Sequence, residues 1–245
     1  MDRVLYVAMT GAKFTLGQQG AVANNLANVS TDGFRAEMHK LRGVEVISNA
    51  MPSRAFVVDA TIANNFETGP LEHTGNVLDV AIKGKGWFVV QTPDGGEAYT
   101  RAGSLEMDPE GVLRTHSGLQ IMGDGGPITI PPNVLLEIGA DGTISAIDPD
   151  AGGVINVIDR IRVVNPDENN LERGDDGLFR TKDGAPAEVD ENAYVVSGYV
   201  EKSNVKVVDQ LVQMISLARQ FEMQTKMISN AQRNDESAAK LLSVR

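Results

Sequence analysis

Hydrophobic residues at the two ends of the chain repeat with the spacing of a helix. Near the start, apolar or small side chains recur at alternating steps of three and four residues, at Leu5, Ala8, Ala12, Thr15, Gln19, Val22, Leu26 and Val29. Similar steps recur near the other end, at Val207, Leu211, Met214, Ala218, Phe221, Thr225 and Ile228. Each set falls on one face of a helix. We predict that helices within 1–35 and 201–245 pair through these faces in a coiled-coil-like rod. The alternative is two core helices of an ordinary globular domain.

Between the two ends the hydrophobic period changes to two, which is typical of strands. Alternating or β-rich runs occupy 77–82 and 87–90, and TPDGGE and MDPEGVL supply hairpin turns at 92–97 and 107–113. The short-strand rhythm continues to Val200. We predict an all-β barrel or sandwich over residues 71–200 and a connecting arm over 36–70. The fold class is therefore expected to be α+β.

Trp87 and Phe88 are neighbours in one predicted strand, so their side chains are expected on opposite faces. One of them would lie in the core, and the other would be available for a subunit contact. The pattern does not decide which is which.

Three asparagines gather on one side of the N-terminal helix. Asn24, Asn25 and Asn28 fall within an arc of about 100°, opposite the apolar face. Residues 14–31 contain no charged side chain, whereas a solvated helix face normally carries charge. Because an amide both donates and accepts, we predict that this face meets neighbouring subunits. The alternative is a turn segment, since Ser-Thr-Asp-Gly at 30–33 supplies a stop signal.

Composition excludes several classes of function. The 245 residues include no cysteine, so neither a disulfide nor a thiolate metal site can form. The net charge is −11, and residues 94–191 hold 20 Asp and Glu against 7 Lys and Arg, a balance of −13. Nucleic acid binding needs a basic surface and is not expected. Neither a cleaved signal peptide nor a membrane-spanning run is indicated.

No catalytic, cofactor or metal site is predicted. The three histidines, His39, His73 and His116, lie far apart in the sequence with no helical pair. Asp148, Asp150, Gly153 and Asp159 have a calcium-loop spacing, but glycine occupies the fifth position and the twelfth lacks glutamate. An acidic hairpin loop is the better interpretation. Residues 83–86 lack the spacing of a phosphate loop.

Several longer stretches resemble a known family. NNLANVSTDGFR at 24–35 and VEKSNVKVVDQLVQMISLARQFEMQTKMI at 200–228 resemble the terminal signatures of the rod, hook and hook-associated axial proteins of the bacterial flagellum. LDVAIKGKGWFVV, EAYTRAGSL, GDGGPITIP, ADGTISAI and DDGLFR resemble the proximal-rod member in particular. The alternative within the family is the distal-rod member, which shares both ends.

The resemblance implies a structural subunit without enzymatic activity. It would stack helically with copies of itself and with other rod proteins into a tube that transmits torque and forms part of the export channel. It also implies passage through the flagellar export apparatus and a periplasmic location in the basal body. A secreted β-rich binding or hydrolytic module with dimerising helices is the alternative from another class. The predicted subunit-contact residues are Asn24, Asn25, Leu26, Asn28, Val29, Phe34, Val207, Leu211, Met214, Ala218, Phe221 and Ile228.

Overall fold

The computed structural model describes residues 3–45, 55–148 and 153–243. The chain folds into two compact units, both built from separated segments. Unit 1 comprises Met1–Val29, Ala36–Asn65 and Val205–Arg245, and unit 2 comprises Ser30–Arg35 and Phe66–Asn204. With two terminal helices and many strands, the fold class is α+β, as predicted.

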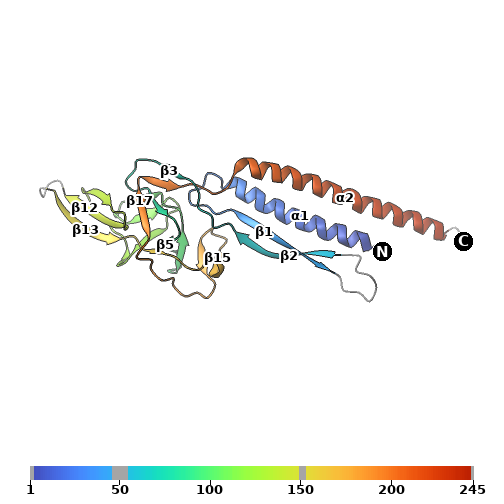
Figure 1. Cartoon of the computed structure of the whole chain (residues 1–245), viewed down its shortest axis with the longest axis horizontal. Coiled ribbons are helices and arrows are strands. Elements are labelled where there is room, and N and C mark those ends of the chain that lie inside the picture. Colours follow the sequence, from blue (N-terminus) through green and yellow to red (C-terminus); the bar gives the residue numbers. More distant parts are fainter. Residues whose placement is uncertain (1–2, 46–54, 149–152, 244–245) are drawn as a thin grey trace. The chain divides into compact units, whose positions relative to one another are not determined.

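Unit 1 contains the two long helices and a strand pair. Helices α1 (Arg3–Ala27) and α2 (Val207–Ser243) lie side by side, with the start of α1 and the end of α2 at the same end of the pair (Figure 1). Strands β1 (Glu37–Glu45) and β2 (Ala55–Asn64) pair antiparallel. The 37 residues of α2 include neither glycine nor proline, so nothing local interrupts the helix. No helix of the described ranges is long and apolar enough to cross a membrane.

Burial along α1 follows the predicted spacing. Ala8, Ala12, Thr15 and Val22 are buried, and Leu5, Gln19, Leu26 and Val29 are half-buried. The helix ends at Ala27, where a run of turn residues begins. The predicted helical face is therefore confirmed for this end of the chain.

On α2 the prediction is only partly right. The buried or half-buried positions step by four and three through Gln210, Met214, Leu217, Phe221, Gln224, Ile228 and Ala231. Two of these residues reach α1: Gln224 Oε1 accepts from Thr15 Oγ1 at 3.1 Å, and Gln210 Oε1 accepts from Asn25 Nδ2 at 3.4 Å. The predicted Val207, Leu211, Ala218 and Thr225 are exposed. Because the first turns of α2 are apolar on more than one side, spacing alone fitted two different faces.

Unit 2 is a β body of several sheets. The largest has nine strands in the order β15-β16-β6-β5-β9-β8-β7, with β10 paired to β9 and β14 to β5. Their bounds are β5 (Trp87–Gln91), β6 (Glu97–Thr100), β7 (Leu105–Met107), β8 (Leu113–Thr115), β9 (Gln120–Gly123), β10 (Gly126–Pro127), β14 (Val163–Val164), β15 (Leu171–Arg173) and β16 (Phe179–Thr181). A short 3-10 helix, η1 (Glu168–Asn170), precedes β15.

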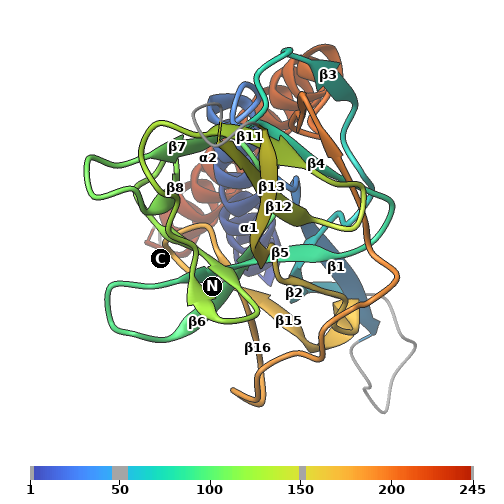
Figure 2. The same cartoon turned by 90° about the vertical axis from the view of Figure 1, so that its left-hand side faces the viewer.

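Three smaller groups of strands complete unit 2. One is a three-stranded sheet in the order β11-β12-β13, and the others are the pairs β17-β4 and β18-β3. Figure 2 shows β12 and β13 adjacent to each other. No closed barrel forms among the strands that the structure describes. The bounds are β3 (Leu71–His73), β4 (Val80–Lys83), β11 (Leu135–Ile138), β12 (Thr143–Asp148), β13 (Val154–Arg160), β17 (Tyr194–Ser197) and β18 (Tyr199–Glu201).

Both predicted hairpins are present. The turn between β5 and β6 is closed by a bond from Thr92 N to the Gly96 carbonyl at 2.9 Å, and Met107 pairs with Leu113 across β7 and β8. Strand β5 is buried on both faces. Phe88 lies in a large aliphatic core and Trp87 in a second, partly aromatic core with Tyr99 and Phe179. The expectation that one of these two aromatic residues faces a subunit contact is therefore wrong.

Candidate functional site

Three charged side chains meet in the interior of unit 2. Arg35 Nη1 donates to Glu201 Oε1 at 2.6 Å, and Arg101 Nη1 donates to Glu201 Oε2 at 2.9 Å. Their side chains are only 1%, 3% and 1% exposed for Arg35, Arg101 and Glu201. We call these three residues the arginine cluster. Since a single carboxylate is shared by two guanidinium groups, the cluster carries an excess positive charge away from water.

The surroundings of the arginine cluster partly offset that excess. The guanidinium carbons of Arg35 and Arg101 lie 5.8 and 5.7 Å from the centre of the Trp87 ring, within the range of cation–π attraction. Arg101 also donates to the carbonyls of Ile82 and Gly84. Burial nevertheless lowers the pKa of Arg101 to about 10, mainly through loss of hydration.

Two backbone amides also reach Glu201, one from a further segment and one from the segment that carries Arg35. The Gly69 amide donates to Glu201 Oε1 at 2.8 Å, and the Gly33 amide donates to the Glu201 carbonyl at 2.7 Å. Gly33 has φ of 69° and approaches so closely that an added Cβ would lie 2.2 Å from the Arg101 carbonyl carbon. An ordinary residue fits neither this backbone conformation nor this space. Segments far apart in the sequence are thus fastened at one point within unit 2.

Replacing Gly33 by alanine is expected to destabilise unit 2 by at least about 2 kcal/mol, because it adds both backbone strain and a clash. Gly20→Ala is the matched control. Its Cβ would meet nothing within 4 Å, so helix propensity should stabilise α1 by up to about 1 kcal/mol. Urea unfolding followed by Trp87 fluorescence reports on unit 2, and far-UV circular dichroism reports on the helices. Equal effects of the two changes would contradict the close approach at Gly33.

The predicted asparagine face does not point uniformly outward. Asn25 is 2% exposed and is held within unit 1. Its Nδ2 donates to the Glu37 carbonyl at 2.8 Å, and its Oδ1 accepts from the Glu37 amide at 2.8 Å. The side chain therefore joins α1 to the start of β1. The prediction that Asn25 is free to meet a neighbouring subunit is wrong, because the backbone of β1 already uses its amide.

The other two asparagines lie nearer the surface. Asn24 is exposed and donates to Glu37 Oε2 at 3.1 Å. Asn28 is half-buried and donates to the Asn24 carbonyl and to Asn24 Oδ1, both at 2.9 Å. The first of these bonds is a local bond from a side chain to the backbone, and Asn28 lies in the turn that follows Ala27, so the turn interpretation holds for Asn28. Contacts between subunits through Asn24 and Asn28 stay a prediction.

The remaining predicted contact residues divide by burial. Phe34 is 7% exposed, and the guanidinium carbon of Arg173 lies 4.5 Å from its ring centre. Phe34 is thus a packing residue of unit 2, which contradicts its predicted subunit contact. Half-buried positions are Leu26, Val29, Met214, Phe221 and Ile228, and exposed positions are Val207, Leu211 and Ala218.

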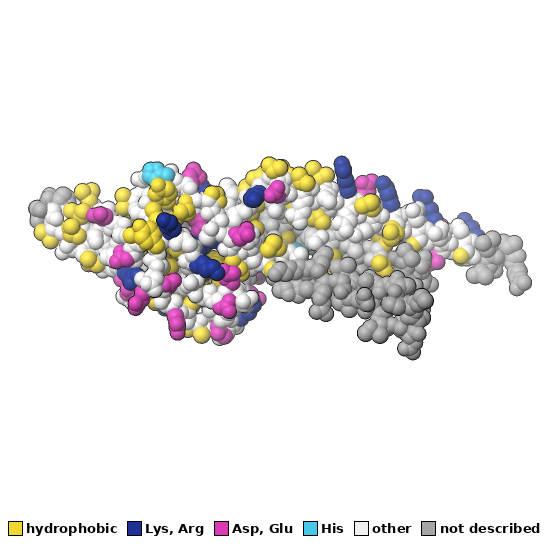
Figure 3. Space-filling model, in the orientation of Figure 1, with side chains coloured by type: hydrophobic (Ala, Val, Ile, Leu, Met, Phe, Trp, Pro, Cys, Tyr) yellow, Lys and Arg dark blue, Asp and Glu magenta, His cyan; other side chains and the backbone are white. Residues whose placement is uncertain are grey.

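An exposed apolar face runs along the first part of α2. Val208, Val212 and Ile215 are 71%, 63% and 56% exposed. At 3.6 residues per turn, they lie on the side opposite Gln210, Met214 and Leu217. Figure 3 shows hydrophobic side chains gathered over this part of the helix, while lysine and arginine side chains are spaced along its later part. A helix that is apolar on both sides is normally covered on both sides.

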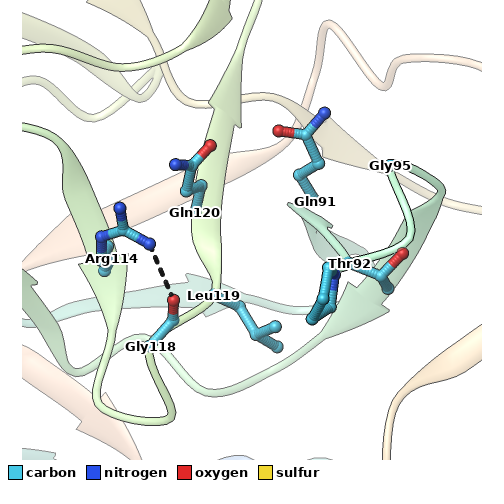
Figure 4. Close-up of a pocket in the computed structure, with 8 residues that line it drawn as sticks. Gln91, Thr92, Gly95, Arg114, Gly118, Leu119 and Gln120 are labelled. Carbon is cyan, nitrogen blue, oxygen red and sulfur yellow. Dashed lines mark hydrogen bonds between the residues drawn. The ribbon is translucent and has the colours of Figure 1, made fainter.

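A surface hollow of about 350 Å³ lies between the β5–β6 turn and the β8–β9 turn. Gln91, Thr92, Arg114 and Gln120 contribute polar groups, and Arg114 Nη1 donates to the Gly118 carbonyl at 3.1 Å (Figure 4). Arg114 also bonds to Asp108, which lowers the pKa of that carboxyl. This hollow brings together no nucleophile and base. The calcium-like spacing cannot be placed, because Asp150 lies outside the described residues.

Three family models of flagellar rod and hook proteins match successive parts of the chain. They are described as flagella basal body rod protein over residues 5–35, flagellar hook protein FlgE/F/G D1 domain over 81–146, and flagellar basal body rod FlgEFG protein C-terminal over 196–241. The flagellar basal-body rod protein FlgF of Salmonella typhimurium strain LT2 is 42% identical over 251 residues, with 100% of both chains covered. The chain belongs to the flagellar basal-body rod protein family. It is a structural rod subunit and not an enzyme.

Within the rod protein family, similarity favours the FlgF branch. FlgF of Escherichia coli strain K12 is 41% identical, again with 100% of both chains covered. FlgG of Buchnera aphidicola subsp. Schizaphis graminum is 30% identical, with 93% of this chain and 95% of the relative covered. The chain is therefore a FlgF-like rod protein, which confirms the predicted resemblance to one member of the family.

Sequence reasoning missed the arginine cluster, although its members lie in stretches that carried the resemblance. Arg35 ends NNLANVSTDGFR, Arg101 lies in EAYTRAGSL, and Glu201 follows Val200 at the start of the C-terminal signature. Charged residues within polar turn segments are normally predicted to be exposed to solvent. No periodic signal marks them as buried, because Arg35 and Arg101 lie in connections and Glu201 ends the three-residue strand β18.

Proposed function

We propose that this chain is a proximal-rod subunit of the flagellar basal body. It assembles with its own copies and with other rod proteins into a helical tube that transmits motor torque and forms part of the export channel. The observation that carries this proposal is the exposed apolar face of α2, which a monomer in water leaves uncovered. A face of this kind fits a chain that works only in an assembly.

In this proposal the terminal helices form the inner tube as a coiled-coil-like pair. Residues 36–70 form an arm, and residues 71–200 form an outer β-rich domain, extended by the segment Ser30–Arg35 and by residues up to Asn204 that cluster with it. The arginine cluster supports this division, because it fastens the segments that run toward α1 and α2 into the β body. Torque applied to the helices would then reach the body through buried ionic contacts.

The chain would leave the cytoplasm through the flagellar export apparatus without a cleaved signal peptide and assemble in the periplasm. The absence of cysteine suits an oxidising compartment, since no thiol could form wrong disulfides during assembly. Its partners would be rod subunits and, in transit, the export apparatus, with no nucleic acid and no inserted membrane segment.

The proposal predicts that the chain is an essential component of purified basal bodies. A strain that lacks its own proximal-rod subunit should regain complete rods and swimming when it expresses this chain. The measurement is mass spectrometry of purified basal bodies together with electron microscopy of their rods. Complete rods that do not contain the chain, in cells that secrete it folded, would overturn the proposal.

A further inference from the structure

Several N–H groups of the arginine cluster meet no protein acceptor. Arg35 Nε, Arg35 Nη2 and Arg101 Nε are buried, and no group in the described part of the chain accepts a hydrogen bond from them. The side chains that carry them are only 1% and 3% exposed. A buried donor without an acceptor costs free energy, and the cost is larger on a charged group. Such donors in a folded protein therefore point to a bound partner.

The two donors of Arg35 lie on the same side of its guanidinium group. Arg35 Nη1 donates to Glu201 Oε1 at 2.6 Å, which engages one corner of the planar group. Nε and Nη2 share the edge away from that corner, and their N–H bonds run nearly parallel because the guanidinium geometry is fixed. This edge is the one that holds an anion with two hydrogen bonds at once. We call Nε and Nη2 the Arg35 fork.

The charge of the arginine cluster also requires an anion. Glu201 accepts from both arginines, so two cations share one carboxylate. The ring of Trp87 attracts both guanidinium groups but carries no charge of its own. Burial is the main cause that lowers the pKa of Arg101; Glu201 opposes it, and the charge of Arg35 lowers the pKa further. One positive charge is thus left without a counter-ion in a site that water does not solvate.

The acidic side chains that could supply this counter-ion bind elsewhere. Asp32, three residues before Arg35, pairs with Lys202 at 2.9 Å. Asp79 is the other carboxylate that is buried among residues of described burial, and it accepts from Ser104 Oγ at 3.1 Å. The missing negative charge therefore has to come from outside the described part of the chain.

We propose that a chloride ion binds inside unit 2 at the Arg35 fork. A halide ion accepts from both N–H groups of the fork and supplies the negative charge that Glu201 alone does not. It is monatomic, so it brings no covalent remainder into a site whose arginine is 1% exposed, as a phosphate ester or a peptide carboxylate would. The proposal concerns the stability of unit 2 and does not depend on the place of the chain in the rod.

Urea unfolding of the purified full-length chain, followed by Trp87 fluorescence, tests for the ion. Sodium chloride is replaced stepwise by sodium gluconate at constant ionic strength, so that screening of surface charges stays the same. An ion that binds only the folded state raises the ratio of folded to unfolded protein by up to tenfold for each tenfold increase in its concentration. We expect the unfolding midpoint to rise with the logarithm of the chloride concentration. An equal midpoint in chloride and in gluconate would overturn the proposal.

Arg35→Lys tests the fork itself. Lysine keeps the positive charge and a donor for Glu201 but has no pair of parallel N–H bonds. The chloride dependence of the midpoint should disappear in this variant. Arg162→Lys is the matched control, because Arg162 Nη1 pairs with Glu97 Oε1 at 2.9 Å and its Nε is also buried without an acceptor, but one cation there meets one anion. This control should keep the chloride dependence of the parent chain.

Crystals of the parent chain grown in sodium bromide locate the ion without any substitution, so this measurement stands even if Arg35→Lys does not fold. The anomalous signal of bromide is expected within hydrogen-bond distance of both Nε and Nη2 of Arg35. Bromide found only at other sites, or a chloride dependence that persists in folded Arg35→Lys, would show that the fork does not hold the ion.

Discussion

Replacing Glu201 by glutamine is expected to lower the free energy of unfolding of unit 2 by about 3–5 kcal/mol. Glutamine keeps the shape of the side chain but removes its charge. Arg35 and Arg101 would then lie buried without a counter-ion, and one amide oxygen cannot accept what two carboxylate oxygens accept. The measurement is urea unfolding followed by fluorescence of Trp87, the single tryptophan of the chain, which lies against both guanidinium groups.

An exposed ion pair of unit 2 supplies the control for this change. Lys85 Nζ lies 2.9 Å from Glu168 Oε1, and the two side chains are 75% and 44% exposed. Glu168→Gln should alter the free energy of unfolding by less than about 1 kcal/mol, because water already solvates both charges. Indistinguishable midpoints for Glu201→Gln and Glu168→Gln would show that the arginine cluster contributes little to stability.

Two aspartate substitutions in α2, placed two residues apart, should separate assembly from folding. Ile215 is 56% exposed and belongs to the exposed apolar face of α2. Ile215→Asp is therefore expected to leave the monomer folded and to abolish rod completion and swimming. Leu217 is 6% exposed on the face toward α1. Leu217→Asp buries an unpaired charge and removes a core side chain, which should destabilise the helix pair by about 3–5 kcal/mol.

The two variants are compared by circular dichroism of the purified chains and by motility of the complemented strains. Helix content equal to the parent chain with no swimming is the result expected for Ile215→Asp. A motile Ile215→Asp strain would mean that the exposed apolar face of α2 is not buried between subunits. Loss of helix content in Ile215→Asp but not in Leu217→Asp would show that the faces of α2 are assigned the wrong way round.

These two experiments probe different requirements of one rod subunit. The Glu201→Gln experiment measures how much the arginine cluster stabilises the β body and the chain segments next to both helices. The aspartate substitutions test the two faces of α2. Leu217→Asp tests the face covered by α1 of the same copy, and Ile215→Asp tests the face that neighbouring copies are proposed to cover. A subunit with an intact arginine cluster but a disrupted exposed face of α2 would be a stable protein that cannot build a rod.

Much of the regular structure could be predicted from the sequence alone. The helical spacing at both ends, the hairpin turns after β5 and β7 and the α+β class follow from local patterns, because periodicity and turn chemistry act over a few residues. The buried face of α1 was also predicted correctly by its spacing. On α2 the first turns are apolar on two sides, so the same rule could not choose the face toward α1.

Other features depended on contacts that no local pattern contains. Asn25 is buried because the backbone of Glu37 in β1 meets its amide, and Trp87 and Phe88 are both buried because β5 has a core on each side. The two ion pairs of the arginine cluster join residues 166 and 100 positions apart. Sequence by itself therefore determined the terminal helices, the hairpins of the β body and the family. The tertiary structure decided that β1 and β2 pair within the predicted arm, and which faces and charges are buried, because pairing and burial depend on partners distant in the chain.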